Sequence, residues 1–153
     1  MSLKMSVAER DAFLADLHVG VISIERENEA PLAVPIWYDY EPEVGVWVIT
    51  DAGSEKGRAL RAAGRFTLCA QVEQPPAYKY VSVEGPIVET RPCDKDADTR
   101  PMAHRYFGPE LGDAYVGSQS NGDSLVFVMR PERWRTVDYA KLGANLGANL
   151  GDG

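Results

Sequence analysis

A basic segment follows an apolar one near the middle of the chain, and its residue types suit a phosphate group. Residues 44–50 are apolar and β-branched, which predicts a strand. Ser54 is a helix N-cap residue type, and Lys56 and Arg58 come in the first turns of the helix predicted at 54–63. Cations at a helix N-terminus oppose the macrodipole, so they are unfavourable unless an anion lies between them. The pattern therefore predicts an anion site at the start of this helix.

The same segment allows a second interpretation, in which an amphipathic helix exposes its charges to water. If the segment does bind an anion, the charge composition of the chain limits the kind of anion. The chain has 16 Lys and Arg against 23 Asp and Glu, which gives a net charge of −7. Nucleic-acid binding depends on a broad basic face, so we predict a small anion and no nucleic acid.

The length of 153 residues suits one domain with its own core. We expect the domain at residues 6–140, after a leader at 1–5. A flexible tail at 141–153 would follow, in which Leu-Gly-Ala-Asn repeats. No apolar run approaches the roughly 20 residues that cross a bilayer, and no signal peptide opens the chain. We expect a cytoplasmic protein with no membrane partner.

Cysteines and histidines are few and scattered. Cys69, Cys93, His18 and His104 lack the spacing of zinc ligands, so we predict no metal site. Both cysteines are expected to be reduced, with Cys69 in a strand core. Ser, His and Asp occur without a nucleophile elbow, which argues against a hydrolase and leaves no catalytic residue assigned.

The elements that must position the anion site are mainly strands. Ser6 and Glu9 form a capping-box pattern, and Gly85-Pro86 is expected to bend a long strand. Strands are predicted at 18–24, 33–40, 44–50, 65–73, 79–90 and 124–130. Helices are predicted at 7–17, 54–63, 95–107 and 109–117. The strand connections are too short for parallel crossovers, so the expected fold is an antiparallel six-stranded barrel, closed or half-closed, with small flanking helices.

In order and spacing, these pieces resemble the split-barrel flavin and deazaflavin oxidoreductases related to pyridoxamine 5′-phosphate oxidase. The resemblance is strongest to the actinobacterial branch, which includes proteins that use the deazaflavin F420. It covers residues 7–138. The matching segments are Pro35-Ile-Trp-Tyr38, Thr50 with Ser54 to Leu60, Pro76 to Gly85, and Arg130 to Thr136. Gly57 and Ala59 depart from the pattern of the family at the helix start.

The resemblance implies an FMN-binding split barrel whose cofactor is FMN or F420. Lys56 and Arg58 would hold the cofactor phosphate, with Ser54 and Thr50 as further donors, and loss of either cation would weaken binding by about 1.5 to 3 kcal/mol. The residues implied to line the ring are Pro35, Ile36 and Trp37. For these three, burial in an ordinary strand is the alternative.

The implied activity is hydride transfer between the cofactor and a small organic substrate. A homodimer is implied, with the cofactor at the subunit interface and the last strand near Trp134 close to the partner's cofactor. Further aromatic groups expected around the ring are Tyr38, Tyr78 and Tyr80. For Tyr78, Tyr80 and Trp134 the alternative is a place in the core or at the subunit interface, which is more frequent for large aromatic residues. Two alternatives remain: a cofactor-binding or carrier protein without turnover, and a haem-binding member of the same fold that uses His104.

Overall fold

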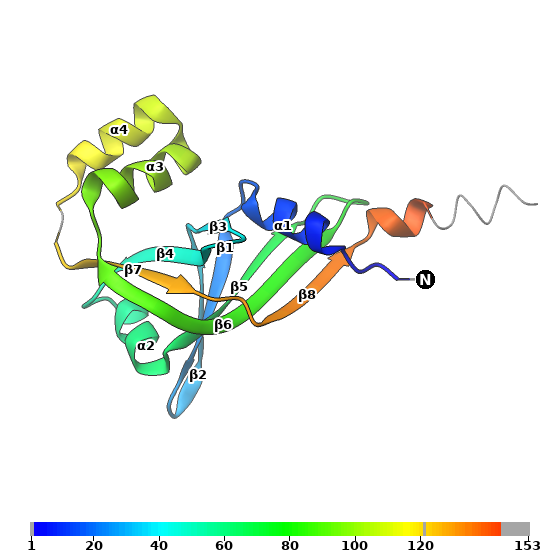
Figure 1. Cartoon of the computed structure of the whole chain (residues 1–153), viewed down its shortest axis with the longest axis horizontal. Helices are drawn as coiled ribbons and strands as arrows, with labels where there is room; N and C mark the ends of the chain where they lie inside the picture. Colours follow the sequence, from blue (N-terminus) through cyan, green and yellow to red (C-terminus); the bar gives the residue numbers. More distant parts are fainter. Residues whose placement is uncertain (1, 121, 145–153) are drawn as a thin grey trace, which may run out of the picture.

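An antiparallel sheet of eight strands runs through the molecule (Figure 1). The structure is a computed structural model that describes residues 2–120 and 122–144. Along the sheet the strand order is β2-β1-β5-β6-β7-β4-β3, and β8 pairs with β6. The prediction of a mainly β, antiparallel fold with small helices is confirmed. The six-strand count is too low, and the sheet is not closed.

The helices and the strands predicted at 44–50, 65–73, 79–90 and 124–130 agree closely with the structure, whereas the strand predicted at 33–40 is divided and β8 is not among the predicted strands. The strands are β1 (Gly20–Arg26), β2 (Glu29–Ile36), β3 (Asp39–Glu41), β4 (Gly45–Asp51), β5 (Arg65–Val72), β6 (Lys79–Pro92), β7 (Ser124–Met129) and β8 (Arg133–Asp138). The helices are α1 (Val7–Ala15), α2 (Glu55–Ala63), the π-helical turn η1 (Lys95–Thr99), α3 (Arg100–Phe107) and α4 (Pro109–Ser118). None of the helices within 2–120 and 122–144 is long and apolar enough to span a membrane.

The strand predicted at 33–40 is divided in two at Trp37 and Tyr38. The backbone N–H of Tyr38 donates to the hydroxyl of Tyr106 at 3.1 Å, and its carbonyl accepts from Nε of Arg105 at 3.0 Å. The side chains of Tyr106 and Arg105 thus occupy the backbone N–H and carbonyl of Tyr38, which in a continuous strand would bond to a neighbouring strand. The chain therefore leaves β1, which β2 pairs with, and begins β3 against β4.

Strand β6 connects two parts of the sheet because it pairs with two different strands, β8 and β7, along one edge. Residues 79–84 of β6 pair with β8, and residues 87–92 pair with β7. Between these two segments the β7–β8 connection crosses Gly85, where a Cβ would overlap the carbonyl oxygen of Arg130. The register of β6 against β7 shifts between Ile87 and Glu89, close to the predicted bend at Gly85-Pro86.

Alternation of side chains along the strands separates a buried face of the sheet from an outer one. In β5, Phe66, Leu68 and Ala70 are buried in the core, while Cys69 points to the other face and is half-buried. The prediction that Cys69 lies in the strand core is therefore wrong. The buried face is covered in part by α1, whose Leu14 is fully buried.

The packed unit begins before the expected boundary at residue 6. Met5 is buried in the core, and the backbone N–H of Asp138 at the end of β8 donates to the carbonyl of Leu3 at 2.8 Å. At the other boundary, Lys141 forms an ion pair with Glu9 of α1 at 2.9 Å. The rest of the expected tail, residues 145–153, lies outside the described residues.

Candidate functional site

Helix α2 begins tightly against the end of β4. The hydroxyl of Ser54 accepts from the backbone N–H of Gly57 at 3.0 Å and donates to the carbonyl of Asp51 at 2.7 Å. The hydroxyl of Thr50 lies 3.1 Å from that of Ser54. A Cβ on Gly57 would overlap the carbonyl oxygen of Asp51, so only glycine allows this approach. The departure of Gly57 from the family pattern thus has a local steric reason.

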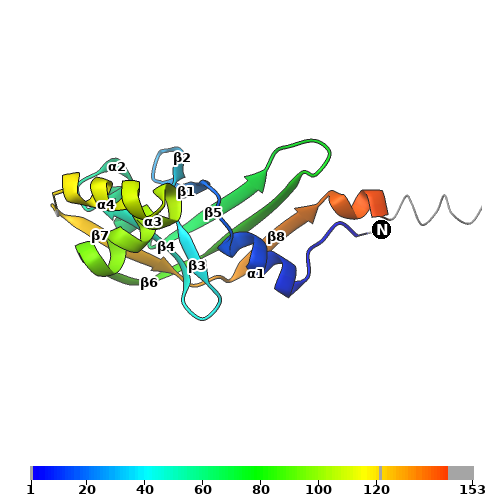
Figure 2. The ribbon, with the colours of Figure 1, turned by 90° about the horizontal axis from the view of Figure 1, so that it is seen from above.

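Helices α3 and α4, called the cap below, pack on each other on one side of the sheet, over the region of β4 and β7 (Figures 1 and 2). Four aromatic rings join the cap to the sheet. The ring of Trp37 stacks on Tyr106 with centroids 4.9 Å apart and an interplanar angle of 6°. It meets Phe107 edge-on at 5.0 Å and Tyr115 at 5.6 Å. Trp37, which follows the end of β2, therefore also packs against the cap.

Polar contacts fix the cap at the same place. The hydroxyl of Tyr106 donates to the carbonyl of His18 at 2.6 Å. The guanidinium of Arg105 donates to the carbonyls of Ala15 at 2.8 Å and Asp16 at 2.7 Å, at the end of α1. Cations near the last carbonyls of a helix are favoured by its dipole. The cap is thus tied to α1 and to the division between β2 and β3.

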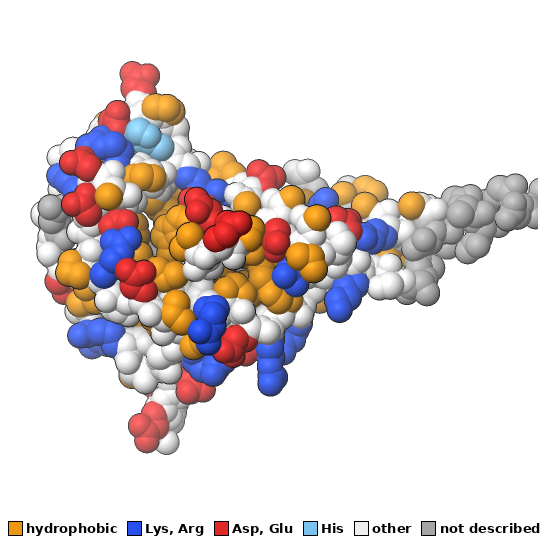
Figure 3. All heavy atoms as spheres, viewed as in Figure 1, with side chains coloured by type: hydrophobic (Ala, Val, Ile, Leu, Met, Phe, Trp, Pro, Cys, Tyr) orange, Lys and Arg blue, Asp and Glu red, His pale blue; other side chains and the backbone are white. Residues whose placement is uncertain are grey.

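A cleft made of two adjoining cavities lies between the cap, the sheet and the start of α2. The first cavity has a volume of about 330 Å³ and is mainly apolar. Its lining residues are Val19, Pro35, Ile36, Trp37, Ile49, Lys56, Thr99, Met102, Ala103 and Tyr115. Figure 3 shows hydrophobic side chains in a hollow beneath the cap. This cavity suits a flat apolar ring.

The second cavity of the cleft has a volume of about 280 Å³ and is mainly polar. It shares Ile49, Lys56, Thr99 and Tyr115 with the first. The others that line it are Thr50, Asp51, Cys93, Lys95, Gln119, Ser120 and Ser124. Hydroxyl groups, two ammonium groups and a helix start are the donors that a phosphate prefers. The donor set of the cleft therefore fits a ligand with an apolar ring and a phosphate.

Six of the seven predicted site residues gather at the cleft. Pro35, Ile36, Trp37 and Lys56 line the apolar cavity, and Thr50 joins Lys56 in the polar one. Ser54 stands beside Thr50 as the cap of α2. Ile36 also belongs to the hydrophobic core, and only 8% of its surface is exposed.

Arg58 lies apart from the other six. Its guanidinium donates to the carbonyl of Gly53, and the cavity it lines is bordered by Glu25, Glu27 and Glu55 rather than by the cap. Two positions along an α-helix correspond to a rotation of about 200°, so Lys56 and Arg58 face different sides of α2. In the structure, Arg58 stabilises the turn before α2 through its hydrogen bond to Gly53.

Several residues of the cleft carry no role in the sequence analysis. Thr99 and Tyr115 line both cavities, and Lys95 and Cys93 line the polar one. The thiol of Cys93 lies 3.2 Å from the hydroxyl of Thr99, and burial raises the pKa of this thiol. Helices at these positions were predicted, but local periodicity does not show that they cover the start of α2.

The three tyrosines expected near the ring lie elsewhere. Tyr38 is fully buried, and its hydroxyl donates to the carbonyl of Leu14 at 2.7 Å. Tyr78 and Tyr80 line a separate apolar cavity with Tyr139, at the β5–β6 hairpin. None of the three lines the cleft within this chain, because strand position alone does not fix which end of the sheet a residue reaches.

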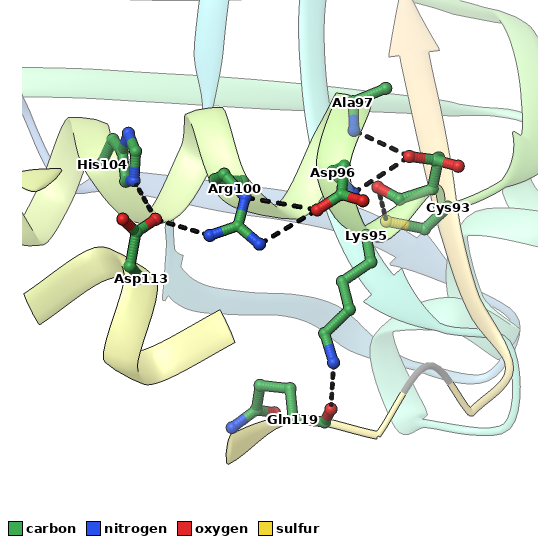
Figure 4. A network of polar contacts seen from close by, with 9 residues as sticks. Cys93, Lys95, Asp96, Ala97, Arg100, His104, Asp113 and Gln119 are labelled. Carbon is green, nitrogen blue, oxygen red and sulfur yellow. Dashed lines mark hydrogen bonds and ion pairs between the residues drawn. The ribbon is translucent and has the colours of Figure 1, made fainter. Parts of the chain in front are cut away.

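Neither described histidine faces the cleft. Nε2 of His104 lies 2.6 Å from the carboxylate of Asp113, which also accepts from Arg100, in the network that joins α3 to α4 (Figure 4). Hydrogen bonds from His104 and then Arg100 lower the pKa of Asp113. His18 donates from Nε2 to the carbonyl of Phe13 at 3.0 Å, and burial lowers its pKa.

Comparison with known proteins gives the same architecture over nearly the whole chain. Residues 7–138 match the family model described as pyridoxamine 5′-phosphate oxidase. No curated protein matches the sequence.

The solved structures that match are similar in fold at low sequence identity. A conserved hypothetical protein, Rv2991 from Mycobacterium tuberculosis, is 23% identical with a TM-score of 0.76, over 94% of this chain and 91% of that one. An F420 reductase is 18% identical with a TM-score of 0.67, over 82% and 94%. A FAD-binding protein from Mesorhizobium loti is 17% identical with a TM-score of 0.62, over 88% and 96%. A heme binding protein from Mycobacterium smegmatis shares the fold at a TM-score of 0.60 and 20% identity, over 89% and 55%.

Proposed function

The chain belongs to the pyridoxamine 5′-phosphate oxidase family, and from this membership we propose that it is an oxidoreductase that binds FMN or F420 in the cleft. The cofactor would transfer hydride to or from a small organic substrate. The observation that carries the proposal is that the two cavities of the cleft adjoin. The apolar cavity beside Trp37 shares Ile49, Lys56, Thr99 and Tyr115 with the polar cavity at the start of α2.

The described residues of the cleft suit binding and orientation. Pro35, Ile36 and Trp37 give one apolar wall, and Met102 and Ala103 of α3 give another. Lys56 supplies a fixed positive charge at a helix start, with the hydroxyl of Thr50 nearby. Bound flavins and deazaflavins supply the hydride chemistry, and the protein contributes position and electrostatics.

We also propose that the protein is a cytoplasmic homodimer in which the outer face of the sheet meets a second copy. Val19, Val21 and Tyr80 are 56%, 40% and 37% exposed, and Val21 pairs with the half-buried Cys69 on this face. Val19 also lines the apolar cavity, which brings this face next to the cleft. Sedimentation at several concentrations tests this, because a 16.8 kDa species alone at micromolar protein would remove the dimer.

A titration followed by a turnover assay tests the proposed function. Purified protein is titrated with FMN, F420 and hemin, and binding is followed by absorbance and fluorescence. We expect FMN or F420 to bind with the largest affinity. Tight binding of hemin alone would favour the haem alternative.

The turnover assay separates an enzyme from a carrier. Stopped-flow mixing of the protein-bound reduced cofactor with quinones, tetrapyrroles and unsaturated carbonyl compounds should show one accelerated acceptor class relative to free cofactor. Tight cofactor binding without acceleration across the panel would instead indicate a carrier.

A further inference from the structure

Two lysines from different elements line the polar cavity of the cleft. Lys56 lies in the first turn of α2, and Lys95 is the first residue of η1, where the chain leaves β6 for the cap. Neither forms an ion pair among residues 2–120 and 122–144. By contrast, Arg91 and Arg100 beside Lys95 are both paired with carboxylates. The cavity thus holds two ammonium groups in a chain whose net charge is −7.

The contacts of Lys95 leave it free to bind an anion. Its Nζ donates to the carbonyl of Gln119 at 3.0 Å, across the cap from η1 to the end of α4 (Figure 4). An ammonium group has three donors, so this bond uses one of them. The Arg100–Asp113–His104 network lies along the helices, and the Lys95 side chain extends away from it (Figure 4).

The carboxylate in this cavity does not neutralise the two lysines by direct contact. Asp51 lines the cavity, but its Oδ1 accepts from the hydroxyl of Ser124 at 2.6 Å. Two like charges in one cavity repel each other, and an anion between them removes that repulsion. A phosphate accepts several charge-assisted hydrogen bonds at once.

We propose that Lys95 is a second phosphate ligand, which binds the cofactor phosphate from η1 while Lys56 binds it from α2. The inference rests on the proposed function. In addition, the bound phosphate would link η1 to α2. A cofactor with a phosphate would therefore also hold the cap over the apolar cavity. Lys95 then acts both as a ligand and as a cation at the end of α4.

The test compares ligands with and without a phosphate. FMN and riboflavin differ only by the terminal phosphate, so this pair decides. F420 and its phosphate-free deazaflavin differ by the phosphodiester together with the tail that it carries, and they are titrated as a supporting pair. Wild-type protein, K95M, K95R and the charge-matched control K79M are titrated with each ligand, and circular dichroism checks the fold. Lys79 lines the cavity at the β5–β6 hairpin, away from the cleft.

We expect K95M to lose about 10- to 100-fold in affinity for the phosphate-bearing ligand, and little for its phosphate-free partner. K95R should retain most of the affinity, and K79M should match the wild type. An equal loss for both members of a pair, or no loss, would overturn the proposal, because a lysine that only caps α4 does not distinguish the ligands. If K56M loses phosphate selectivity and K95M keeps it, this inference fails and the proposed function stands. If the wild type binds none of the four ligands, both fail.

Discussion

Helices α1 and α2 begin with the same residue in nearly the same conformation, yet their first turns differ in chemistry. The N-caps Ser6 and Ser54 have φ, ψ of −67°, 167° and −71°, 164°. In α1, the third helical residue is Glu9, whose carboxylate accepts from the backbone N–H of Ser6 at 2.9 Å. In α2 the same position is Gly57, and the backbone N–H of Ser54 donates to the carbonyl of Asp51 instead.

The difference gives one capping pattern a structural role at α1 and, in the proposed function, a binding role at α2. The start of α1 is neutralised by its own carboxylate, which is paired with Lys141. The start of α2 faces the cleft with Lys56. In both helices the N–H groups of the N-cap and of the third residue are bonded. The difference is one of charge: the Glu9 carboxylate lies on the N-cap of α1, whereas the carboxylate in the first turn of α2, that of Glu55, is paired with Arg26 at 3.0 Å. A carboxylate held at the N-cap offsets the dipole and lowers the attraction of the helix start for an outside anion.

The largest effect is expected at Gly57, the residue that sets the approach of α2 to β4. Gly57→Ala should lower the free energy of unfolding by about 3 kcal/mol, because the new Cβ would overlap the carbonyl oxygen of Asp51. Gly117→Ala in α4 is the control, where no atom lies within 4 Å of a Cβ. That change should stabilise the protein by about 0.5 kcal/mol. Urea unfolding measures both, and equal stability of G57A and wild type would contradict the steric account.

Substitution of Lys56 and of Arg58, two cations of α2, should have different effects on the affinity for the cofactor. Lys56→Met is expected to weaken binding of FMN or F420 by about 1.5 to 3 kcal/mol, the range for one charge-assisted hydrogen bond. Arg58→Met should weaken it by less than about 0.5 kcal/mol, because its guanidinium is on Gly53 and outside the cleft. Fluorescence titration of the two variants measures both affinities, and an equal loss of affinity would show that Arg58 reaches the ligand.

The matched substitutions Ser6→Ala and Ser54→Ala compare the two helix starts directly. Each removes an N-cap side chain and should cost about 1 kcal/mol of stability. Only S54A should also weaken cofactor binding, since Ser54 holds Thr50 and the first turn of α2 beside the polar cavity. Thermal unfolding and titration of both variants test this. A loss of cofactor affinity in S6A would mean that the helix starts are not independent.

The smallest effect is a dependence of stability on pH at the start of α1. The hydrogen bond from the Ser6 backbone, followed by that from Lys141, lowers the pKa of Glu9 from 4.5 to about 2. Because the pKa is lowered on folding, the contribution is complete above pH 4.5 and is lost as the pH falls towards 2. Glu9→Gln should therefore have a lower urea midpoint than wild type near neutral pH, and the difference should vanish in acid. A difference that does not change with pH would exclude the carboxylate as its cause.

Local sequence signals are sufficient for the parts that local chemistry decides. Both Ser N-caps, the capping box and the limits of β4, β5 and β7 follow from residue types a few positions apart. Two errors had a signal in the sequence. Alternation with Phe66, Leu68 and Ala70 places Cys69 on the outer face, and helical rotation separates Arg58 from Lys56.

The cap over the site was not predictable in this way, because distant contacts position it. The hydroxyl of Tyr106 bonds to His18, 88 positions earlier in the chain. The roles of Lys95, Thr99 and Tyr115 depend on this packing. The same contacts divide the strand at Tyr38, where the periodicity of the sequence continues without a break.

The cap is also inserted in the sheet at a point where its removal would leave the ladder intact. The backbone N–H of Cys93 donates to the carbonyl of Ser124 at 2.9 Å, so the two ends of residues 94–123 already meet as the last pair of a β6–β7 hairpin. The register of β6 against β7 is set by pairs outside this segment, so it does not depend on the length of residues 94–123. A change of length within 94–123 would therefore alter the covering of the candidate cleft while leaving the β6–β7 ladder in place.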